Sequence, residues 1–449
     1  MKRHVLIIGG GLAGLTAALR VSAQGYAVTL VDQDRELGGR LLQSDTEALP
    51  VVFLGYQQAT LSLLQTLGTA SHVSFSNRLR LEFLLPDRGA SGTARRVRWP
   101  RPLMPAPFHT ILGLTLFRGL SRRDRWRLLM LLERTWEGDP PLPADLEHRT
   151  AAAWLTESGQ STDAANHVWN PLAHFLVGNG LTNISAAILV ATLTRCFLTA
   201  RRHAGLAIPD CDLRPLFLEP AHEKLLQAGA LLRLDTTVEH LRFDAHRITG
   251  VQLRSGGMLT ADWYVVALPH RHLSPLLPER ALTRFAYFQH LTKLIDTPAL
   301  TVHLWLNRPV PTPHVLLLAE RPFHWLVCRA EGESADRQTR VSLTATGRPD
   351  LLARPDQELL ELALKEVGTA LPKTGVAGAK DYRIVRQPHA FLSIGPGTAA
   401  LRPLQQSPFP NLFLAGDWTD TGLPATLESA ILSGDLCAKA IQARQTGTP

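Results

Sequence analysis

Three glycines near the start of the chain have the spacing of a phosphate-binding turn. Gly9, Gly11 and Gly14 follow the apolar run His4-Val5-Leu6-Ile7-Ile8, which suits a buried strand. A helix-compatible segment comes next, and a second apolar run ends at Asp32. Such glycines let the backbone turn sharply toward a pyrophosphate at a helix N-terminus, and an acid about 20 residues on bonds a ribose hydroxyl. The order of these pieces predicts a βαβ dinucleotide-binding unit.

Two further motifs, one near each end of the chain, indicate which dinucleotide is bound. Gly38-Gly39-Arg40 follows Asp32, and the distant run Asn411-Leu412-Phe413-Leu414-Ala415 leads into Gly416-Asp417. Both motifs resemble those of the flavin amine oxidase and phytoene desaturase superfamily, which implies FAD as the cofactor, with Arg40 bracing its phosphates. The residues that the glycine motif and the resemblance together place at FAD are Gly9, Gly11, Leu12, Ala13, Gly14, Asp32, Gly38, Gly39, Arg40, Val238, Gly416, Asp417, Pro424, Ala425 and Thr426.

The residues after Gly416-Asp417 narrow the resemblance. The run Gly422-Leu423-Pro424-Ala425-Thr426-Leu427-Glu428 resembles the squalene-associated FAD enzymes, the hydroxysqualene dehydroxylases, in which the last helix directs backbone amides at the flavin. Trp169-Asn170-Pro171-Leu172 and the segment 208–221 also resemble patterns of that family. The resemblance implies reductive removal of the hydroxyl of hydroxysqualene, which gives squalene for hopanoid biosynthesis.

The leaving group of this reaction requires acid catalysis. Hydroxide leaves poorly, so a proton donor or a strong hydrogen-bond donor must assist. The cofactor carries the hydride chemistry, and the protein supplies orientation and a dry, apolar tunnel for the polyprenoid. Asp210, Asp212 and His174 are the candidate proton donors. The alternative roles are helix capping or loop turns for the aspartates and a hydrogen-bonded core position for the histidine.

One segment departs from the family pattern and keeps other functions open. The family resemblance predicts a polar Asp-Asn-Gly-Gln-His run before Phe53-Leu54-Gly55, but this chain has Leu49-Pro50-Val51-Val52. The first alternative is a phytoene-type carotenoid desaturase, which takes hydride from a polyprenoid and passes electrons to a quinone or oxygen. An alternative of another class is a flavin-binding accessory scaffold in a prenyl-lipid complex. An amine oxidase is disfavoured, because that branch usually has Gly-Glu where this chain has Gly416-Asp417.

Composition agrees with a large enzyme. The 449 residues exceed what one hydrophobic core usually supports, and the 45% apolar fraction permits extensive cores. Four cysteines without a C-x-x-C pattern oppose a disulfide framework or a thiolate metal site, and suit a reducing compartment. The net charge of +8 comes from dispersed basic residues without a recognition module, so we expect no nucleic-acid partner. We also expect no metal, because the cysteines show no metal-binding spacing. Oligomeric state is not indicated.

The motif positions predict an α/β fold whose FAD-binding domain is interrupted twice. Residues 1–45, 216–280 and 406–449 are predicted to form a Rossmann-like domain, a parallel sheet crossed by a β-meander. Residues 46–215 and 281–405 are predicted to form a mixed α+β substrate-binding domain. The meander is expected from short strands over 231–234, 237–243, 247–253 and 263–269, with a hairpin turn at Gly256-Gly257.

The first insertion is predicted to be largely helical. Apolar spacing predicts a helix over 120–136, with Ser121 as its cap and Asp124 in its first turn, and another over 186–198. The second insertion is predicted to contain a strand over 300–306 and a helix over 355–371.

The segment from Arg98 to Arg127 combines basic and aromatic residues. Trp99, Phe108, Phe117 and Trp126 would enter a lipid headgroup layer if the segment rests on a membrane, with arginines facing phosphates. The alternative is that these aromatic residues form core of the substrate domain. Neither a signal peptide nor a transmembrane pattern is evident. We therefore expect a cytoplasmic protein, with peripheral attachment to the inner face of the membrane as the alternative.

Overall fold

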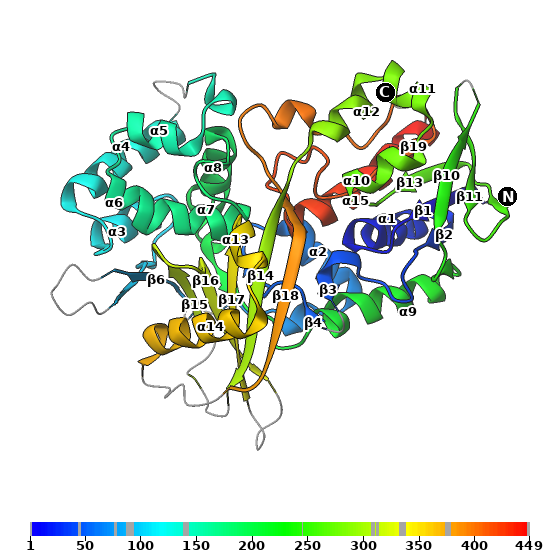
Figure 1. Ribbon diagram of the computed structural model, residues 1–449. Coiled ribbons are helices and arrows are strands. Elements are labelled where there is room, and N and C mark those ends of the chain that lie inside the picture. The colour runs from blue at the N-terminus through cyan, green and yellow to red at the C-terminus, as the bar shows by residue number, and fades with distance from the viewer. Residues whose placement is uncertain are drawn as a thin grey trace.

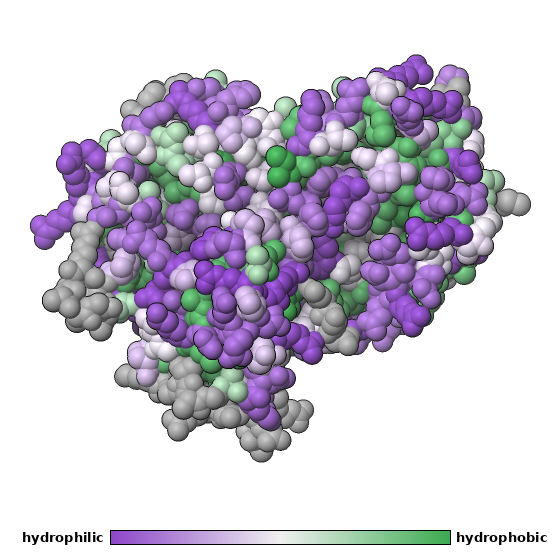
Figure 2. Space-filling model, in the orientation of Figure 1, coloured by the Kyte–Doolittle hydropathy of each residue, from purple (hydrophilic) through white to green (hydrophobic). Residues whose placement is uncertain are grey.

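Two sheets organise the molecule, and each has its own half (Figure 1). The computed structural model describes residues 2–43, 46–75, 79–86, 94–137, 143–244, 246–306, 310, 314–331, 338–372 and 379–446. Figure 2 shows that the face seen in Figure 1 is mainly hydrophilic, with hydrophobic side chains gathered in small patches.

The first sheet is parallel and five-stranded, in the order β19-β13-β1-β2-β9. Its strands are β1 (His4–Ile8), β2 (Ala27–Val31), β9 (Leu231–Arg233), β13 (Trp263–Val266) and β19 (Leu412–Leu414). The strands of its centre are apolar along almost their whole length because both faces of the sheet are covered. The predicted βαβ unit is confirmed: α1 (Leu12–Ala23) joins β1 to β2.

A small antiparallel sheet and four helices complete this half. The sheet contains β10 (Val238–Phe243), β11 (Ile248–Leu253) and β12 (Met258–Leu259), and corresponds to the middle of the predicted meander. The strands predicted over 231–234 and 263–269 are instead β9 and β13 of the parallel sheet. Gly256 and Gly257 both have positive φ, near +86° and +85°, in the confirmed turn between β11 and β12. The helices α2 (Gln58–Leu67), α9 (Glu219–Gln227) and α15 (Leu427–Thr446) lie with α1 beside the parallel sheet (Figure 1).

The second sheet is mixed and seven-stranded, in the order β18-β14-β17-β16-β15-β6-β7. Only the β15–β6 pair is parallel among these described strands. The strands are β6 (Leu81–Leu85), β7 (Arg95–Arg98), β14 (Asp296–Leu306), β15 (His314–Leu318), β16 (Trp325–Glu331), β17 (Gln338–Thr346) and β18 (Ala379–Leu392). The first insertion is therefore not purely helical, because β6 and β7 extend this sheet. The α/β fold class with a Rossmann-like sheet and a mixed second sheet is confirmed.

The remaining helices belong to both halves. In chain order they are α3 (Phe108–Leu116), α4 (Arg122–Glu137), α5 (Ala151–Glu157), α6 (Thr162–Ala164), α7 (Asn170–Val177), α8 (Ala186–Leu193), α10 (His270–Leu273), α11 (Glu279–Arg284), α12 (Ala286–Gln289), α13 (Pro349–Leu352) and α14 (Asp356–Ala370). Of these, α10, α11 and α12 lie beside the first half, near β13 and β19, and the others lie on the side of the second sheet (Figure 1). Ser121 caps α4 as predicted: its hydroxyl accepts from the Asp124 amide at 3.1 Å and donates to the Asp124 carboxylate at 2.7 Å. The helix predicted over 186–198 is α-helical only to Leu193 and continues as a π-helical turn, Thr194–Leu198.

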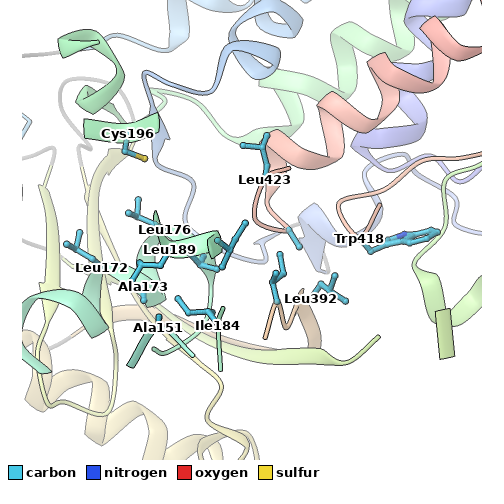
Figure 3. Packing of buried hydrophobic residues seen from close by; sticks show 14 of the residues in the cluster. Ala151, Leu172, Ala173, Leu176, Ile184, Leu189, Cys196, Leu392, Trp418 and Leu423 are labelled. Carbon is cyan, nitrogen blue, oxygen red and sulfur yellow. The ribbon is translucent and has the colours of Figure 1, made fainter. Parts of the chain in front are cut away.

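One hydrophobic cluster joins the two halves (Figure 3). Leu172 and Leu176 of α7 belong to it, together with Leu392 at the end of β18 and with Trp418 and Leu423 of the C-terminal flavin motif. The substrate-side helices are thus packed against the segment that the sequence places at FAD. Within the part of the chain described above, no helix is both long and apolar enough to cross a bilayer.

Candidate active site

A deep cleft opens where the two halves meet at the carboxyl ends of β1, β2 and β19. Its empty space, including the part open to solvent, is about 2010 Å³. In a parallel α/β sheet this edge is the usual ligand position, because loops and helix N-termini converge there. The predicted cofactor residues that line the cleft are Gly9, Gly11, Leu12, Ala13, Asp32, Gly38, Gly39, Arg40, Gly416, Asp417, Ala425 and Thr426.

The glycines of the first turn have different surroundings. A Cβ atom on Gly11 would meet no protein atom within 4 Å, so this position faces the open cleft. A Cβ on Gly14 would lie 1.9 Å from the Gly9 carbonyl oxygen, and one on Gly9 would lie 2.6 Å from the Ala267 oxygen. Gly14 therefore allows close packing of α1 on β1, whereas Gly11 leaves room for a ligand.

Asp32 stands at the end of β2, where a ribose-binding acid is required. Its carboxylate accepts hydrogen bonds from the backbone amides of Gly10 and Asp34, the latter at 2.8 Å. Burial raises its pKa, and the two amide donors oppose that rise. The side chain is thus held in place at the mouth of the glycine turn.

At the other end of the cleft, a side-chain hydrogen bond connects the two flavin motifs. Arg40 donates to the Asp417 carboxylate at 2.6 Å and to the Ala390 carbonyl at 3.3 Å. Gln387 of β18 donates to the Arg40 carbonyl at 3.2 Å, while its own side-chain oxygen is buried without a partner among the described residues. This oxygen lines a cleft that needs acceptors for a polyhydroxylated ligand.

The rest of the cleft has an apolar wall. The residues that depart from the family pattern, Leu49-Pro50-Val51-Val52, all line it, together with Phe53 and Leu54. Further apolar lining comes from other elements: Phe175, Leu176, Leu213, Trp325 and Phe391. Tyr56 follows this segment and also lines the cleft, and burial raises the pKa of Tyr56 well above its ordinary value.

Three predicted cofactor residues do not line the cleft. Gly14 lies inside α1, and Val238 begins β10, where it packs partly buried against the main hydrophobic cluster. Pro424 precedes Ala425 and Thr426, which do line it.

The three predicted proton donors do not line the cleft either. Asp210 bonds the His72 ring nitrogen at 2.7 Å, and its side chain is 69% exposed. Asp212 is paired with Arg329, which lowers the pKa of Asp212 against the effect of burial. His174 is buried and stacks on His324, with ring centroids 3.5 Å apart, and bonds the Thr346 hydroxyl at 2.7 Å. The structure does not bring these groups together or to the cleft, because each already has a partner on a neighbouring element.

Several residues that line the cleft were not predicted from the sequence. Arg271, His272, Gln387, Ala390 and Phe391 line the cleft, as does Trp418. Arg271 and His272 come shortly after the strand predicted over 263–269, and this position was an available signal. The β18 residues carry no local signal, because only the packing of the second sheet brings them to Arg40.

The donor set of the cleft fits FAD. It offers a glycine turn with open space at Gly11, an acid for a ribose, an Arg40–Asp417 pair for the phosphate and ribityl region, and an apolar wall beyond. A fold and site of this kind define an FAD-dependent oxidoreductase.

Comparison with known proteins specifies the family. Residues 12–442 match the family of flavin-containing amine oxidoreductases, and the chain belongs to that family. It is 27% identical to the 15-cis-phytoene desaturase of Synechococcus elongatus, covering 98% of this chain and 96% of that one. It is 23% identical to the zeta-carotene desaturase of Synechocystis sp., covering 98% of each. The cyclohexylamine oxidase of Brevibacterium oxydans has the same fold, with a TM-score of 0.71 at 18% identity over 99% of this chain and 100% of that one.

Proposed function

We propose that this enzyme desaturates a long polyprenoid of the carotenoid type. Desaturation removes a hydride from one carbon and a proton from its neighbour. Bound FAD supplies the hydride acceptor, and a quinone or oxygen would then take the electrons. The chain's own residues hold the polyprenoid along the apolar wall, and the proton leaves to solvent through the open side of the cleft. The similarity to phytoene and zeta-carotene desaturases over nearly the whole chain supports this assignment.

The observation that carries the proposal is the apolar wall. A hydrocarbon substrate needs contact area and dryness rather than hydrogen bonds, and the lining from Leu49 to Leu54 with Phe175 and Leu176 provides that. Reductive dehydroxylation, the first interpretation of the sequence, needs a proton donor at the leaving hydroxyl. Among the described residues that line the cleft the only imidazole is that of His272 in α10, and the apolar wall itself offers a leaving hydroxyl no acid, which favours desaturation over dehydroxylation.

Two parallel assays test the assignment. The FAD-loaded protein is incubated with phytoene in liposomes and a quinone, and conjugated polyenes are followed by absorbance and chromatography. The same protein, reduced with dithionite without oxygen, is incubated with hydroxysqualene, and squalene is measured by mass spectrometry. Polyene formation supports the proposal. Squalene formed while phytoene stays intact would replace it with the dehydroxylase.

A variant of the wall separates substrate binding from cofactor binding. Val51→Asp places a charge among apolar lining residues, so turnover is expected to fall about tenfold or more while FAD remains bound. Val51→Ala is the matched control, with a smaller loss. Equal activity of the wild type and Val51→Asp would contradict a polyprenoid path along this wall.

We also propose a lipid surface as the partner, since long polyprenoids reside in membranes. The basic segment keeps part of its predicted aromatic surface: Phe108 is 50% and Trp126 66% exposed. Trp99 and Phe117 are instead core residues, with ring centroids 4.9 Å apart, because they pack against Phe83 of the second sheet. Leu103, 80% exposed, precedes α3 and extends the apolar surface.

A further inference from the structure

Two segments that are far apart in the sequence bring three potential metal ligands together. His72 ends the 3-10 turn Ala70–His72 that follows α2, and Asp210 and Cys211 lie in the loop before the π-helical turn Arg214–Leu218. A His72 ring nitrogen, an Asp210 oxygen and the Cys211 sulfur all lie within 4.8 Å of one another. The expectation of no metal came from the spacing of the cysteines, which contains no information about a histidine 138 residues away from Asp210.

Backbone hydrogen bonds hold both segments in place. The Asp210 amide donates to the His72 carbonyl at 3.1 Å, which joins the two segments directly. The Cys211 carbonyl accepts from the Arg329 guanidinium at 3.0 Å, which ties the loop to β16. Because the backbone at these ligands is already fixed, an ion would need only side-chain rotation in order to bind, and a preorganised site of this kind favours binding.

The three donor atoms are a nitrogen, an oxygen and a sulfur, and this set suits zinc. Zinc binds imidazole nitrogen and carboxylate oxygen at about 2.0–2.2 Å and thiolate sulfur at about 2.3 Å, usually in a tetrahedron of four ligands. With those bond lengths, neighbouring ligand atoms lie roughly 3.2–3.8 Å apart, so shifts of about 1 Å at the side-chain ends would reach that geometry. The side chains of His72 and Asp210 are 45% and 69% exposed, so water can take the fourth position.

The charges around the sulfur favour a cation. Burial, together with the negative charges of Asp210, Asp212 and Glu47, raises the pKa of the Cys211 thiol to about 11. The positive charge of Arg329 opposes this rise. A divalent cation bound here would be attracted by the same carboxylates, and the coordinating thiol would give up its proton to the solvent.

We propose that His72, Asp210 and Cys211 bind one zinc ion, with water as the fourth ligand. The ion would connect the turn after α2 to the loop that contains Leu213, a residue of the cleft lining. The role of Asp210 would then be metal coordination rather than proton donation. None of the three ligands lines the cleft, so this inference goes beyond the proposed function and does not rest on it.

Zinc binding to the FAD-loaded protein tests the proposal. The protein, without an affinity tag, is treated with EDTA, dialysed and titrated with Zn²⁺ by isothermal titration calorimetry. One zinc ion per chain is expected to bind, and X-ray absorption at the zinc edge should show one sulfur at about 2.3 Å. Cys211→Ser and His72→Gln should each weaken binding about tenfold or more, since even changes in the groups that support metal ligands have effects of that size. His240→Gln, at an exposed position of β10, is the matched control and should change nothing.

The sulfur signal distinguishes this site from adventitious zinc on surface histidines. The other three cysteines of the chain are fully buried, so a sulfur at the bound zinc identifies Cys211. Absence of zinc binding would overturn the inference, as would bound zinc without a sulfur ligand or an affinity that survives both variants; His72 and Asp210 would then form a surface ion pair only. Retained flavin absorbance shows that each variant is folded. These measurements need no turnover, so a failure to desaturate phytoene would count against the proposed function and leave this inference standing.

Discussion

Single atoms decide what each glycine of the first turn contributes. A side chain on Gly11 points into open space in the cleft, so Gly11→Val would occupy the cofactor's volume without disturbing the protein. We expect FAD content after gel filtration to fall at least about tenfold, and the free energy of unfolding of the apoprotein to change by less than about 0.5 kcal/mol, as for a site outside the core. A variant that stays yellow would disprove our placement of the pyrophosphate.

In contrast to Gly11→Val, Gly14→Ala is expected to reduce the stability of the protein. Its Cβ would stand 1.9 Å from the Gly9 carbonyl oxygen, so α1 must move away from β1. We expect the apoprotein to lose about 1–3 kcal/mol of stability, as overpacking usually costs. Thermal unfolding of the two apoproteins side by side measures the difference. Equal stability would mean that the turn relaxes more readily than its packing suggests.

Two buried histidines make stability depend on pH. Burial lowers the pKa of His303 and His324 to about 3. In the unfolded chain a histidine has a pKa of about 6.5, so as pH falls below that value only the unfolded state gains a proton. Their contribution is complete above about pH 6.5 and is lost as pH falls toward 3.

The prediction concerns the slope of stability against pH. For each of these histidines the free energy of unfolding should fall by up to about 1.4 kcal/mol per pH unit as pH falls from about 6.5 to about 4. His303→Gln should flatten the slope by that amount, even though it loses bonds to Ser342 and to the Glu47 carbonyl. Urea unfolding at several pH values measures it, and His246→Gln, in an exposed turn, is the control. Parallel slopes for the wild type and His303→Gln would contradict the assignment.

At the scale of elements, one carboxylate connects the flavin helix to the apolar wall. Glu428 in the first turn of α15 accepts from the amides of Ala59 and Thr60, at 2.9 and 2.8 Å, and from the Thr60 hydroxyl at 2.6 Å. It thereby satisfies free N–H groups at the start of α2, the helix that follows the wall.

Removing this carboxylate should loosen both elements. Glu428→Ala leaves two buried amides unsatisfied, so we expect a loss of about 2–4 kcal/mol in unfolding free energy and weaker FAD retention. Glu428→Gln keeps an acceptor oxygen and should lose less than half as much. Chemical unfolding and FAD titration of both variants give the comparison. If Gln is as harmful as Ala, the acceptor bonds are not the source of stability.

The sequence predicts correctly those elements that depend on a short local pattern of residues. The βαβ unit, the Gly256-Gly257 turn and the Ser121 cap follow from short stretches, and the structure has each where it was expected. The π-helical continuation after Leu193 was not predictable, because no local pattern distinguishes it from α-helix. The pairing of β6 with β15 joins strands separated by more than half of the chain, and sequence periodicity does not contain that information.

The same division holds for the site at the scale of the whole molecule. Its cofactor half comes from terminal motifs with fixed geometry, and twelve of the predicted residues line the cleft. Its substrate half depends on how the second sheet docks, so Gln387 and Phe391 were missed, and Asp210, Asp212 and His174 were placed near a cofactor that they do not approach. Acidic and imidazole groups are chemically versatile, but their neighbours, rather than their identity, decide whether they do chemistry.

At the scale of the whole molecule, we expect one exposed apolar surface to contact lipid. Leu103 and Phe108 are exposed beside a run of arginines around α4, so both apolar burial and charge attraction favour an anionic bilayer. The wild type should co-sediment more with phosphatidylglycerol than with phosphatidylcholine vesicles, and less at high salt. The double variant L103S/F108S should bind about tenfold more weakly or worse, since each buried side chain contributes about 1.5–3 kcal/mol. Leu404→Ser, at a 63% exposed position far along the chain, is the control. If L103S/F108S sediments like Leu404→Ser, the enzyme draws its substrate from another face.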